Sequence, residues 1–201
     1  MEQRAREAAN DRFMHRLREA FHAYGYEQIN MVGLAKACSL SRRALYYHFS
    51  NKDEAFRGML LWGQEKSAEA GLAAGRRVLA EGGSGLEIVV AVMDACYADS
   101  RRMLSRSAHA AELNYVVFRR FPDVATYVAG MFQDRLAELL GEMAEQGKLR
   151  LRSGVLPAAL AQFLCEGVRG ANQHLADHRA DGLAERCRAM CEAILFGCCE
   201  R

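Results

Sequence analysis

The sequence predicts an all-α protein with nine helices in two domains. Apolar residues recur at spacings of three and four along most of the 201 residues, and runs with the alternating pattern of a strand are nearly absent. Only two prolines, Pro122 and Pro157, interrupt this pattern. Since 51% of the residues are hydrophobic, the chain can also bury a substantial core.

The first three predicted helices are short and follow one another closely. We expect them at 11–24, 31–38 and 41–49. Gly25 can end the first helix, and the side chains of Asn30 and Ser41 are suited to cap the second and the third. A tight turn at 39–40 separates the second helix from the third. This arrangement predicts a helix-turn-helix, in which the third helix enters the major groove of DNA.

The remaining helices are longer. Ser50 can cap a fourth helix at 52–79, and a glycine-rich loop at 81–85 follows it. The segment 88–98 is apolar on nearly all sides, with Asp94 as its one charged residue, so we expect it to lie in a buried central helix. We expect the last five helices at 86–106, 108–119, 123–146, 155–177 and 181–196.

The outer face of the third helix is suited to DNA. If Leu45 points inward, the helical step of about 100° places Arg43, Tyr46 and Tyr47 on the opposite side. Arg42 and Arg43 stand at the start of the helix, where a guanidinium can bind guanine O6 and N7 together. The segment 28–52 contains no carboxylate. The residues expected to contact DNA are Asn30, Lys36, Ser41, Arg42, Arg43, Ala44, Tyr46, Tyr47, His48 and Lys52.

The same segment resembles the signature of the TetR family of transcription regulators. The resemblance lies in Tyr24-Gly25-Tyr26, Leu34-Ala35, the run from Ser41 to Phe49 and Asn51-Lys52-Asp53. Ser39 stands where the family usually has a turn glycine. The resemblance implies a homeodomain-like DNA-binding domain at 1–51, and a ligand-binding and dimerisation domain at 52–201 to which helix 52–79 connects it. It also implies a homodimer on a palindromic double-stranded DNA operator and a small-molecule effector.

Two further sets of residues are expected in the second domain. An effector pocket would be lined mainly by apolar side chains, which favours a largely apolar effector. We expect this pocket to be lined by Trp62, Met93, Cys96, Tyr97, Met103, Tyr115, Phe118, Phe163 and Glu166. For the dimer interface we expect the last two helices to contribute Gly167, Gly170, Ala171, Cys187, Met190, Cys191, Ile194 and Leu195, although both stripes could instead close the core of one chain.

Other classes of function have less support in the sequence. His109 and Glu112 stand three residues apart, as a surface pair would, and no pattern typical of catalysis, of a metal site or of a cofactor site is present. The seven cysteines do not form a disulfide framework and fit a reducing cytoplasm, where we expect the protein, with no membrane segment. A redox or metal response through Cys187 and Cys191, or through Cys198 and Cys199, stays open as an alternative.

Overall fold

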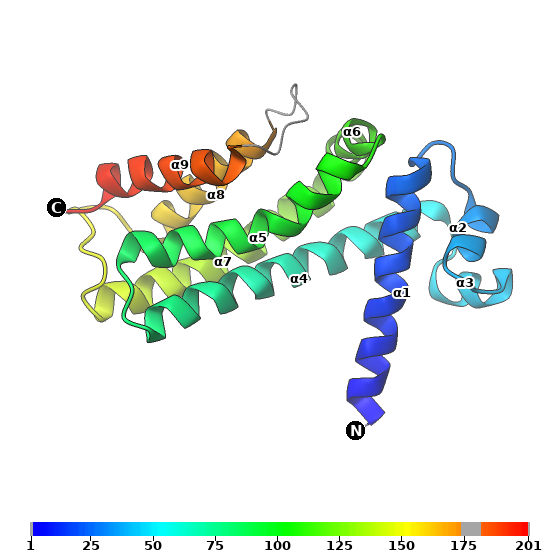
Figure 1. Cartoon of the computed structure of the whole chain (residues 1–201), viewed down its shortest axis with the longest axis horizontal. Coiled ribbons are helices and arrows are strands. Elements are labelled where there is room, and N and C mark those ends of the chain that lie inside the picture. The colour runs from blue at the N-terminus through cyan, green and yellow to red at the C-terminus, as the bar shows by residue number, and fades with distance from the viewer. Residues whose placement is uncertain (1, 174–181, 201) are drawn as a thin grey trace. The chain divides into compact units, whose positions relative to one another are not determined.

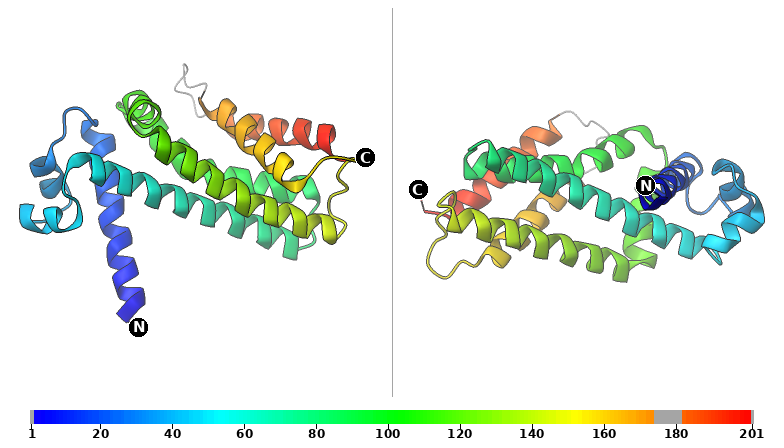
Figure 2. Two further views of the ribbon diagram at one scale, coloured as in Figure 1. Left: turned by 180° about the vertical axis from the view of Figure 1, so that it is seen from behind. Right: turned by 90° about the horizontal axis from the view of Figure 1, so that it is seen from below.

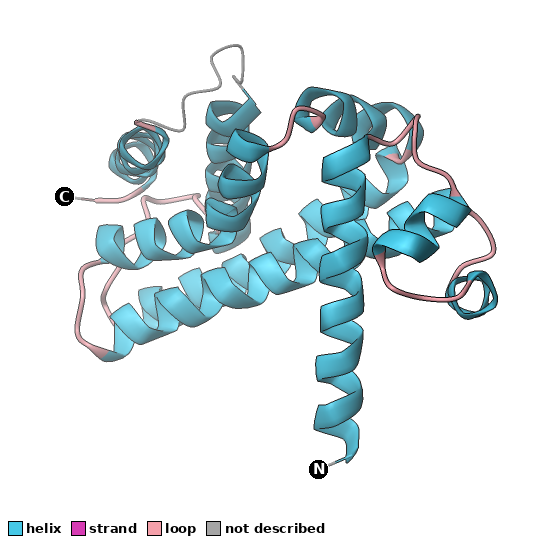
Figure 3. Cartoon of the chain, turned by 45° about the vertical axis from the view of Figure 1, so that its right-hand side comes forward, coloured by secondary structure: helices cyan, strands magenta, loops and turns pink. Residues whose placement is uncertain are grey.

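The protein is all-α, as the sequence predicts. The computed structural model describes residues 2–173 and 182–200, apart from the side chains of 2–6, 99–100, 103–104, 171–173 and 183 (Figure 1). The described residues form nine helices and one isolated bridge, between Leu151 and Cys199. Figure 3 shows the helices and the loops that join them. The helices are α1 (Glu2–Tyr24), α2 (Met31–Ala37), α3 (Arg42–His48), α4 (Lys52–Ala80), α5 (Gly85–Arg106), α6 (Ala110–Arg120), α7 (Pro122–Glu145), α8 (Pro157–Gln173) and α9 (Leu183–Cys198).

The chain divides into two compact units. Unit 1 comprises residues 1–64 and 106–125, and unit 2 comprises residues 65–105 and 126–201. Unit 1 therefore contains α6 and the first half of α4 in addition to the three N-terminal helices. The expected boundary between residues 51 and 52 concerns the division of function and stays a prediction.

Unit 1 has an aromatic core. Phe21, Tyr26 and Phe56 are fully buried, and their ring centroids lie 4.9–6.1 Å apart. Phe121, which ends α6, adds its ring at 5.3 Å from that of Phe56. Aromatic pairs at such distances stabilise a fold beyond the area that they bury. The C-terminal end of α6 is thereby fixed to the helices around the predicted DNA-binding segment.

Unit 2 has an aliphatic core that contains the expected central helix. Ile88, Val89, Val92 and Met93 of α5 are all 0% exposed. α8 and α9 pack along each other in this unit (Figure 2). Gly71 and Gly75 of α4 allow α5 to approach closely, since a Cβ atom on either residue would lie within 3 Å of α5 atoms. The prediction of a buried helix at 88–98 is thus confirmed.

Two local predictions are corrected by the structure. α1 begins at Glu2 instead of residue 11. Asn51, and not Ser50, caps α4, because its Oδ1 accepts the Glu54 amide at 2.9 Å. The Glu54 carboxylate in turn accepts the Ser50 amide at 2.8 Å, and this hydrogen bond holds the pKa of Glu54 below its usual value.

In the part of the chain that is described, no helix has the length and apolar character needed to cross a membrane.

Candidate nucleic-acid interface

The second and third helices form the expected helix-turn-helix. Asn30 Oδ1 accepts the amides of Val32 and Gly33 at 3.1 and 3.0 Å, and Ser41 Oγ accepts the Ala44 amide at 3.1 Å. The turn between the helices passes through Ser39 at a φ of +57°, in the left-handed region that a glycine adopts at lower cost. Both predicted caps are therefore present, and serine carries the strained position of the turn.

The outer face of α3 is exposed, and the inner face is closed by Leu45. Leu45 is 0% exposed, whereas Tyr47 is 88% and Tyr46 is 49% exposed. Arg42, Arg43 and His48 are also exposed, and Ala44 is half-buried. The His48 ring lies 4.9 Å from that of Phe13 of α1, so α1 supports this face from the side. The structure thus brings six of the predicted residues together on one short helix.

Other residues predicted to contact DNA lie around this helix. Lys36 is exposed on α2, while the side-chain oxygens of Asn30 and Ser41 are engaged as caps. Lys52 is half-buried, and its Nζ donates a hydrogen bond to the Tyr26 carbonyl at 2.6 Å and lies 4.4 Å from the centre of the Tyr26 ring. Lys52 therefore has a structural contact in addition to its predicted role at a phosphate.

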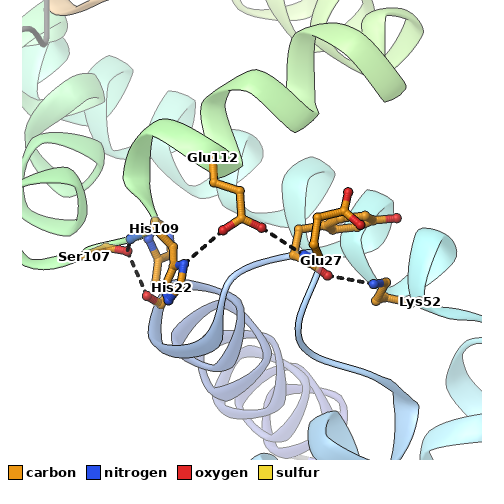
Figure 4. Close-up of polar contacts among 7 residues, drawn as sticks. His22, Glu27, Lys52, Ser107, His109 and Glu112 are labelled. Carbon is orange, nitrogen blue, oxygen red and sulfur yellow. Dashed lines mark hydrogen bonds and ion pairs between the residues drawn. The ribbon is translucent and has the colours of Figure 1, made fainter.

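The loop between α1 and α2 is held by residues from the start of α6. The Glu112 carboxylate accepts the Glu27 amide at 2.9 Å with one oxygen and contacts His109 Nδ1 at 2.9 Å with the other (Figure 4). Ser107 Oγ donates to the His22 carbonyl at 2.8 Å and accepts the His109 amide at 3.1 Å. These residues, Ser107, His109 and Glu112, are called the α6 clamp below.

The clamp lowers the pKa of Glu112 and leaves no room for a side chain at Gly25. Burial opposes ionisation of Glu112, but hydrogen bonds from the Glu27 amide and His109 outweigh it and hold the pKa of Glu112 below its usual value. Gly25 lies against the clamp with a φ of +77°, and a Cβ atom there would lie 2.5 Å from Glu112 Oε2 and 2.6 Å from His109 Nδ1. The pair expected at the surface therefore anchors the entrance to the helix-turn-helix.

Two more contacts strengthen unit 1. Arg120 of α6 lies 3.5 Å from the Glu27 carboxylate and 3.9 Å from that of Asp53, which also accepts the Tyr26 hydroxyl. Trp62 of α4 donates from Nε1 to Asp11 of α1 at 2.8 Å, and Arg18 lies over its ring. Trp62, predicted to line an effector pocket, thus joins α4 to α1.

The other residues of the predicted pocket are distributed over both units. In unit 1, Tyr115 and Phe118 are exposed on α6 at 59% and 46%. In unit 2, Met93 and Cys96 lie in the core, Tyr97 is half-buried, and Phe163 and Glu166 are exposed on α8. The side chain of Met103 lies outside the described part. As a ligand site, this set stays a prediction.

Several residues predicted for the dimer interface are used within one chain. Cys187, Cys191 and Leu195 are 1%, 0% and 7% exposed and belong to the core of unit 2. Gly167 faces α9, because a Cβ atom on it would lie 2.9 Å from Ile194 and 3.1 Å from Met190. Gly170 is exposed, with open space around it, and the side chain of Ala171 lies outside the described part. Among the members of this set whose side chains are described, Gly170 is exposed, and Gly167, Met190 and Ile194 are half-buried.

A surface hollow in unit 1 was not anticipated from the sequence. It has a volume of about 520 Å³ and is lined by residues from the end of α1, the α1–α2 loop and α2: Tyr24, Gln28, Ile29, Asn30, Gly33, Lys36 and Ala37. The lining contains no carboxylate, and it contains the exposed Lys36. Six of its seven lining residues thus belong to the carboxylate-free segment 28–52. In the described residues, no group of three or more His, Cys, Asp or Glu side chains is placed to hold a metal.

Comparison with known families identifies the DNA-binding segment. The family model described as bacterial regulatory proteins, tetR family, matches residues 14–59. This range contains α2, α3 and the C-terminal part of α1 from residue 14, and it ends within α4. No curated protein sequence gives a significant match to the chain.

Solved structures share the fold over nearly the whole chain. SmeT, described as the repressor of the Stenotrophomonas maltophilia multidrug efflux pump SmeDEF, has a TM-score of 0.68 at 17% identity, covering 94% of this chain and 90% of its own. A putative TetR-family regulator from Mesorhizobium loti has a TM-score of 0.70 at 16% identity, covering 94% and 96%. Thermus thermophilus FadR, solved with lauroyl-CoA, has a TM-score of 0.66 at 21% identity, covering 93% of both chains.

Proposed function

We propose that the chain is a repressor of the TetR family of DNA-binding transcription regulators, because the family model matches residues 14–59 and solved TetR-family structures share the fold. Regulators of this family are not enzymes. It binds a palindromic operator as a homodimer, with one α3 helix in the major groove at each half-site. A small-molecule effector, bound within the helical part of the chain, releases it from the operator.

The observation that carries this proposal is the exposed polar face of α3. Arg42 and Arg43 occupy its first turn, and both are exposed, while Leu45 fixes the helix from the buried side. An arginine at this position can read guanine through two hydrogen bonds. Tyr46, Tyr47 and the exposed Lys36 are suited to phosphate oxygens, which position the protein and do not specify sequence.

The test begins with the selection of an operator from random double-stranded DNA by the purified chain. Arg43→Ala should then cost about 1–3 kcal/mol of operator binding and relax the preference at one base pair. Arg77→Ala is the matched control, because Arg77 is an exposed arginine of α4 that belongs to unit 2. Equal effects of the two substitutions on affinity and base preference would refute the role assigned to α3.

For the homodimer, we propose the exposed faces of α8 and α9. Gly170 and Phe163 are exposed on α8, and Ala189, Ala193 and Phe196 are exposed at helical spacing on α9. Small residues beside aromatic ones allow close approach with a large apolar contact. These residues take the place of Cys187 and Cys191, which have no surface left for a partner chain.

For the effector, we propose a molecule with a large apolar part. The apolar lining predicted from the sequence supports this class, and the FadR relative was solved in complex with lauroyl-CoA. Titration of the operator complex with acyl thioesters and with apolar drugs tests the class. Release of DNA by small hydrophilic molecules alone would contradict it.

A further inference from the structure

The surface hollow of unit 1 is lined mainly by side chains that donate hydrogen bonds. Four of its seven lining residues are of this kind: Tyr24, Gln28, Asn30 and Lys36. All four are exposed, and the lining contains no carboxylate. Lysine, tyrosine, asparagine and glutamine are among the side chains that contact the phosphates of DNA. The proposed function assigns a phosphate to Lys36 but gives no part to Tyr24 or Gln28.

These donors are not used inside the described part of the chain. The Tyr24 hydroxyl, the Gln28 amide and the Lys36 ammonium form no hydrogen bond or ion pair with any residue described. Asn30 Oδ1 accepts two backbone amides as the cap of α2, which fixes the side chain, and no described residue accepts from its Nδ2 group. A ligand with acceptor oxygens can therefore bind these donors without breaking a contact within the chain.

A glycine leaves the floor of the hollow open. Gly33 stands inside α2, where a glycine weakens a helix relative to alanine. A Cβ atom on Gly33 would lie 3.2 Å from Ile29 Cγ1 and 3.7 Å from Asn30 Oδ1, and both of these residues line the hollow. A longer side chain at position 33 would therefore enter the hollow. Without one, the backbone of α2 is open to close approach by a ligand.

The charges next to the hollow favour an anion. The segment 28–52 supplies six of the seven lining residues and contains no carboxylate. Glu27, the carboxylate that precedes this segment, lies 3.5 Å from the guanidinium of Arg120 of α6. The positive charge of Arg120 offsets that of the carboxylate. Lys36 then gives the lining itself a net positive charge.

Double-stranded DNA is the anion that fits this position. In a helix-turn-helix, the helix before the recognition helix crosses the phosphate backbone. Here that helix is α2, which packs against α3 (Figure 1). The hollow, at about 520 Å³, is many times larger than the volume of about 30 Å³ that a water molecule takes up, so it has room for a sugar together with its phosphate. A small-molecule site usually encloses its ligand within mainly apolar walls, whereas the donors of this hollow are exposed.

We propose that the hollow of unit 1 holds a sugar–phosphate segment of the operator, with Tyr24 and Gln28 contacting its phosphates together with Lys36. Phosphates carry no base sequence, so this contact strengthens binding to any duplex and positions α2 on the backbone while α3 reads the bases. The inference rests on the proposed function, because it takes α3 to be the recognition helix.

The first experiment measures binding of the full chain to its selected operator and to a random duplex at several salt concentrations. Gln28→Lys adds a cation to the hollow, so it should tighten binding to both duplexes about five- to tenfold at about 0.1 M salt and steepen the salt slope by about 0.9. Gln64→Lys is the matched control. Gln64 is exposed on α4 in unit 1, about 18 Å along the helix from Lys52, so the same charge there should leave the slope unchanged.

The second experiment fills the hollow. Gly33→Met and Gly33→Ala place the same Cβ atom against Ile29, but only the methionine side chain extends further into the hollow. We expect Gly33→Met to bind both duplexes at least tenfold more weakly than Gly33→Ala. Urea denaturation of both variants checks that the difference in affinity does not come from a difference in stability.

The third experiment locates the phosphate. Gln28→Ala should weaken operator binding about three- to tenfold, because one hydrogen bond to a phosphate is lost. Ethylation of the phosphate that Gln28 contacts should weaken binding of the native chain and have a smaller effect on Gln28→Ala, since the two changes remove the same interaction. Ethylation effects that are identical in the two proteins at every phosphate would contradict the contact.

The outcomes separate this inference from the proposed function. An unchanged salt slope in Gln28→Lys, or equal affinities of Gly33→Met and Gly33→Ala, would overturn the site in the hollow and leave the repressor proposal standing. If the chain prefers no operator, or if Arg43→Ala leaves the base preference unchanged, the repressor proposal fails. The steeper slope of Gln28→Lys on the random duplex would then still identify the hollow as a site for the DNA backbone.

Discussion

Gly25 combines a left-handed backbone with a close side-chain contact. In Gly25→Ala, the φ of +77° should cost about 1–2 kcal/mol, and the contact of the new Cβ with Glu112 and His109 about 1–3 kcal/mol more. Gly154→Ala is the matched control, because Gly154 has a φ of +84° and open space around it, so only the first cost applies. Urea denaturation measures the unfolding free energy of both variants. Equal losses in the two variants would show that the clamp makes no steric contact with a side chain at position 25.

Glu112 should make the stability of unit 1 depend on pH. Its pKa in the folded chain lies below that in the unfolded chain, since the Glu27 amide and His109 stabilise the carboxylate against the effect of burial. The contribution to stability is therefore fully present above the unfolded value of about 4.3, and it is lost as the pH falls through the lower folded value.

The check is a series of unfolding measurements between pH 7 and pH 3 for the native chain and for Glu112→Gln. The glutamine retains an acceptor for the Glu27 amide and has no titrating group. The two stabilities should therefore converge as the pH falls. A constant difference over the whole range would mean that the charge of Glu112 has no part in the clamp.

Lys52 has a structural contact in addition to its predicted DNA contact, whereas Lys36 is exposed and is predicted to contact DNA. Lys52→Ala should lower the unfolding free energy by about 1.5–3 kcal/mol, because the ammonium donates to the Tyr26 carbonyl. Lys36→Ala should leave stability unchanged, because Lys36 is exposed. Each substitution should reduce the salt dependence of operator binding by about one phosphate contact. A destabilised Lys36→Ala variant or an unchanged salt slope would contradict these roles.

Among the helices, prediction from the sequence succeeded where one face is apolar. The helical spacing around Leu17 and Phe21 identifies α1, but residues 2–10 are charged, polar or small after the initial methionine, so no apolar stripe indicates that the helix begins at Glu2. The helix-turn-helix was predictable residue by residue because its caps, turn and inward Leu45 are all local in sequence.

The α6 clamp was not predictable, because its contacts are not local. Glu112 and the Glu27 amide are 85 residues apart, and nothing in the spacing of His109 and Glu112 indicates that Glu112 accepts a backbone amide of the α1–α2 loop. Trp62 shows the same limit: an aromatic residue on a long helix suggests a core or a ligand, but its Nε1 bonds to Asp11, 51 residues away. Long-range hydrogen bonds of this kind leave no periodic signal.

The two glycines of α8 should behave in opposite ways. Gly167→Ala should destabilise the chain by about 1–3 kcal/mol, since its Cβ would press on Ile194 and Met190. Gly170→Ala should raise the unfolding free energy of the monomer by about 0.5–1 kcal/mol, because this helical position is open. Gly170→Glu should instead weaken the dimer in sedimentation. A dimer unaffected by that charge would place the interface away from this face of α8.

At the scale of the whole molecule, the effector must bind the state that does not hold DNA more tightly than the state that does. A coupling free energy of about 1–3 kcal/mol would lower operator affinity about 5- to 150-fold. By reciprocity, operator DNA should weaken effector binding by the same factor, which calorimetry with and without the operator measures. Effector binding that operator DNA leaves unchanged would contradict this coupling.

The discontinuous make-up of unit 1 bears on the construction of hybrid regulators. A chimaera that takes only the first 51 residues from this chain leaves Glu27 without Glu112 and Arg120, and Asp11 without Trp62. A transplant that carries both 1–64 and 106–125 preserves these partners. Exchange of DNA specificity between members of the family should therefore succeed when both segments are transferred together. Homologous α6 helices need not be interchangeable even where the recognition helices are identical.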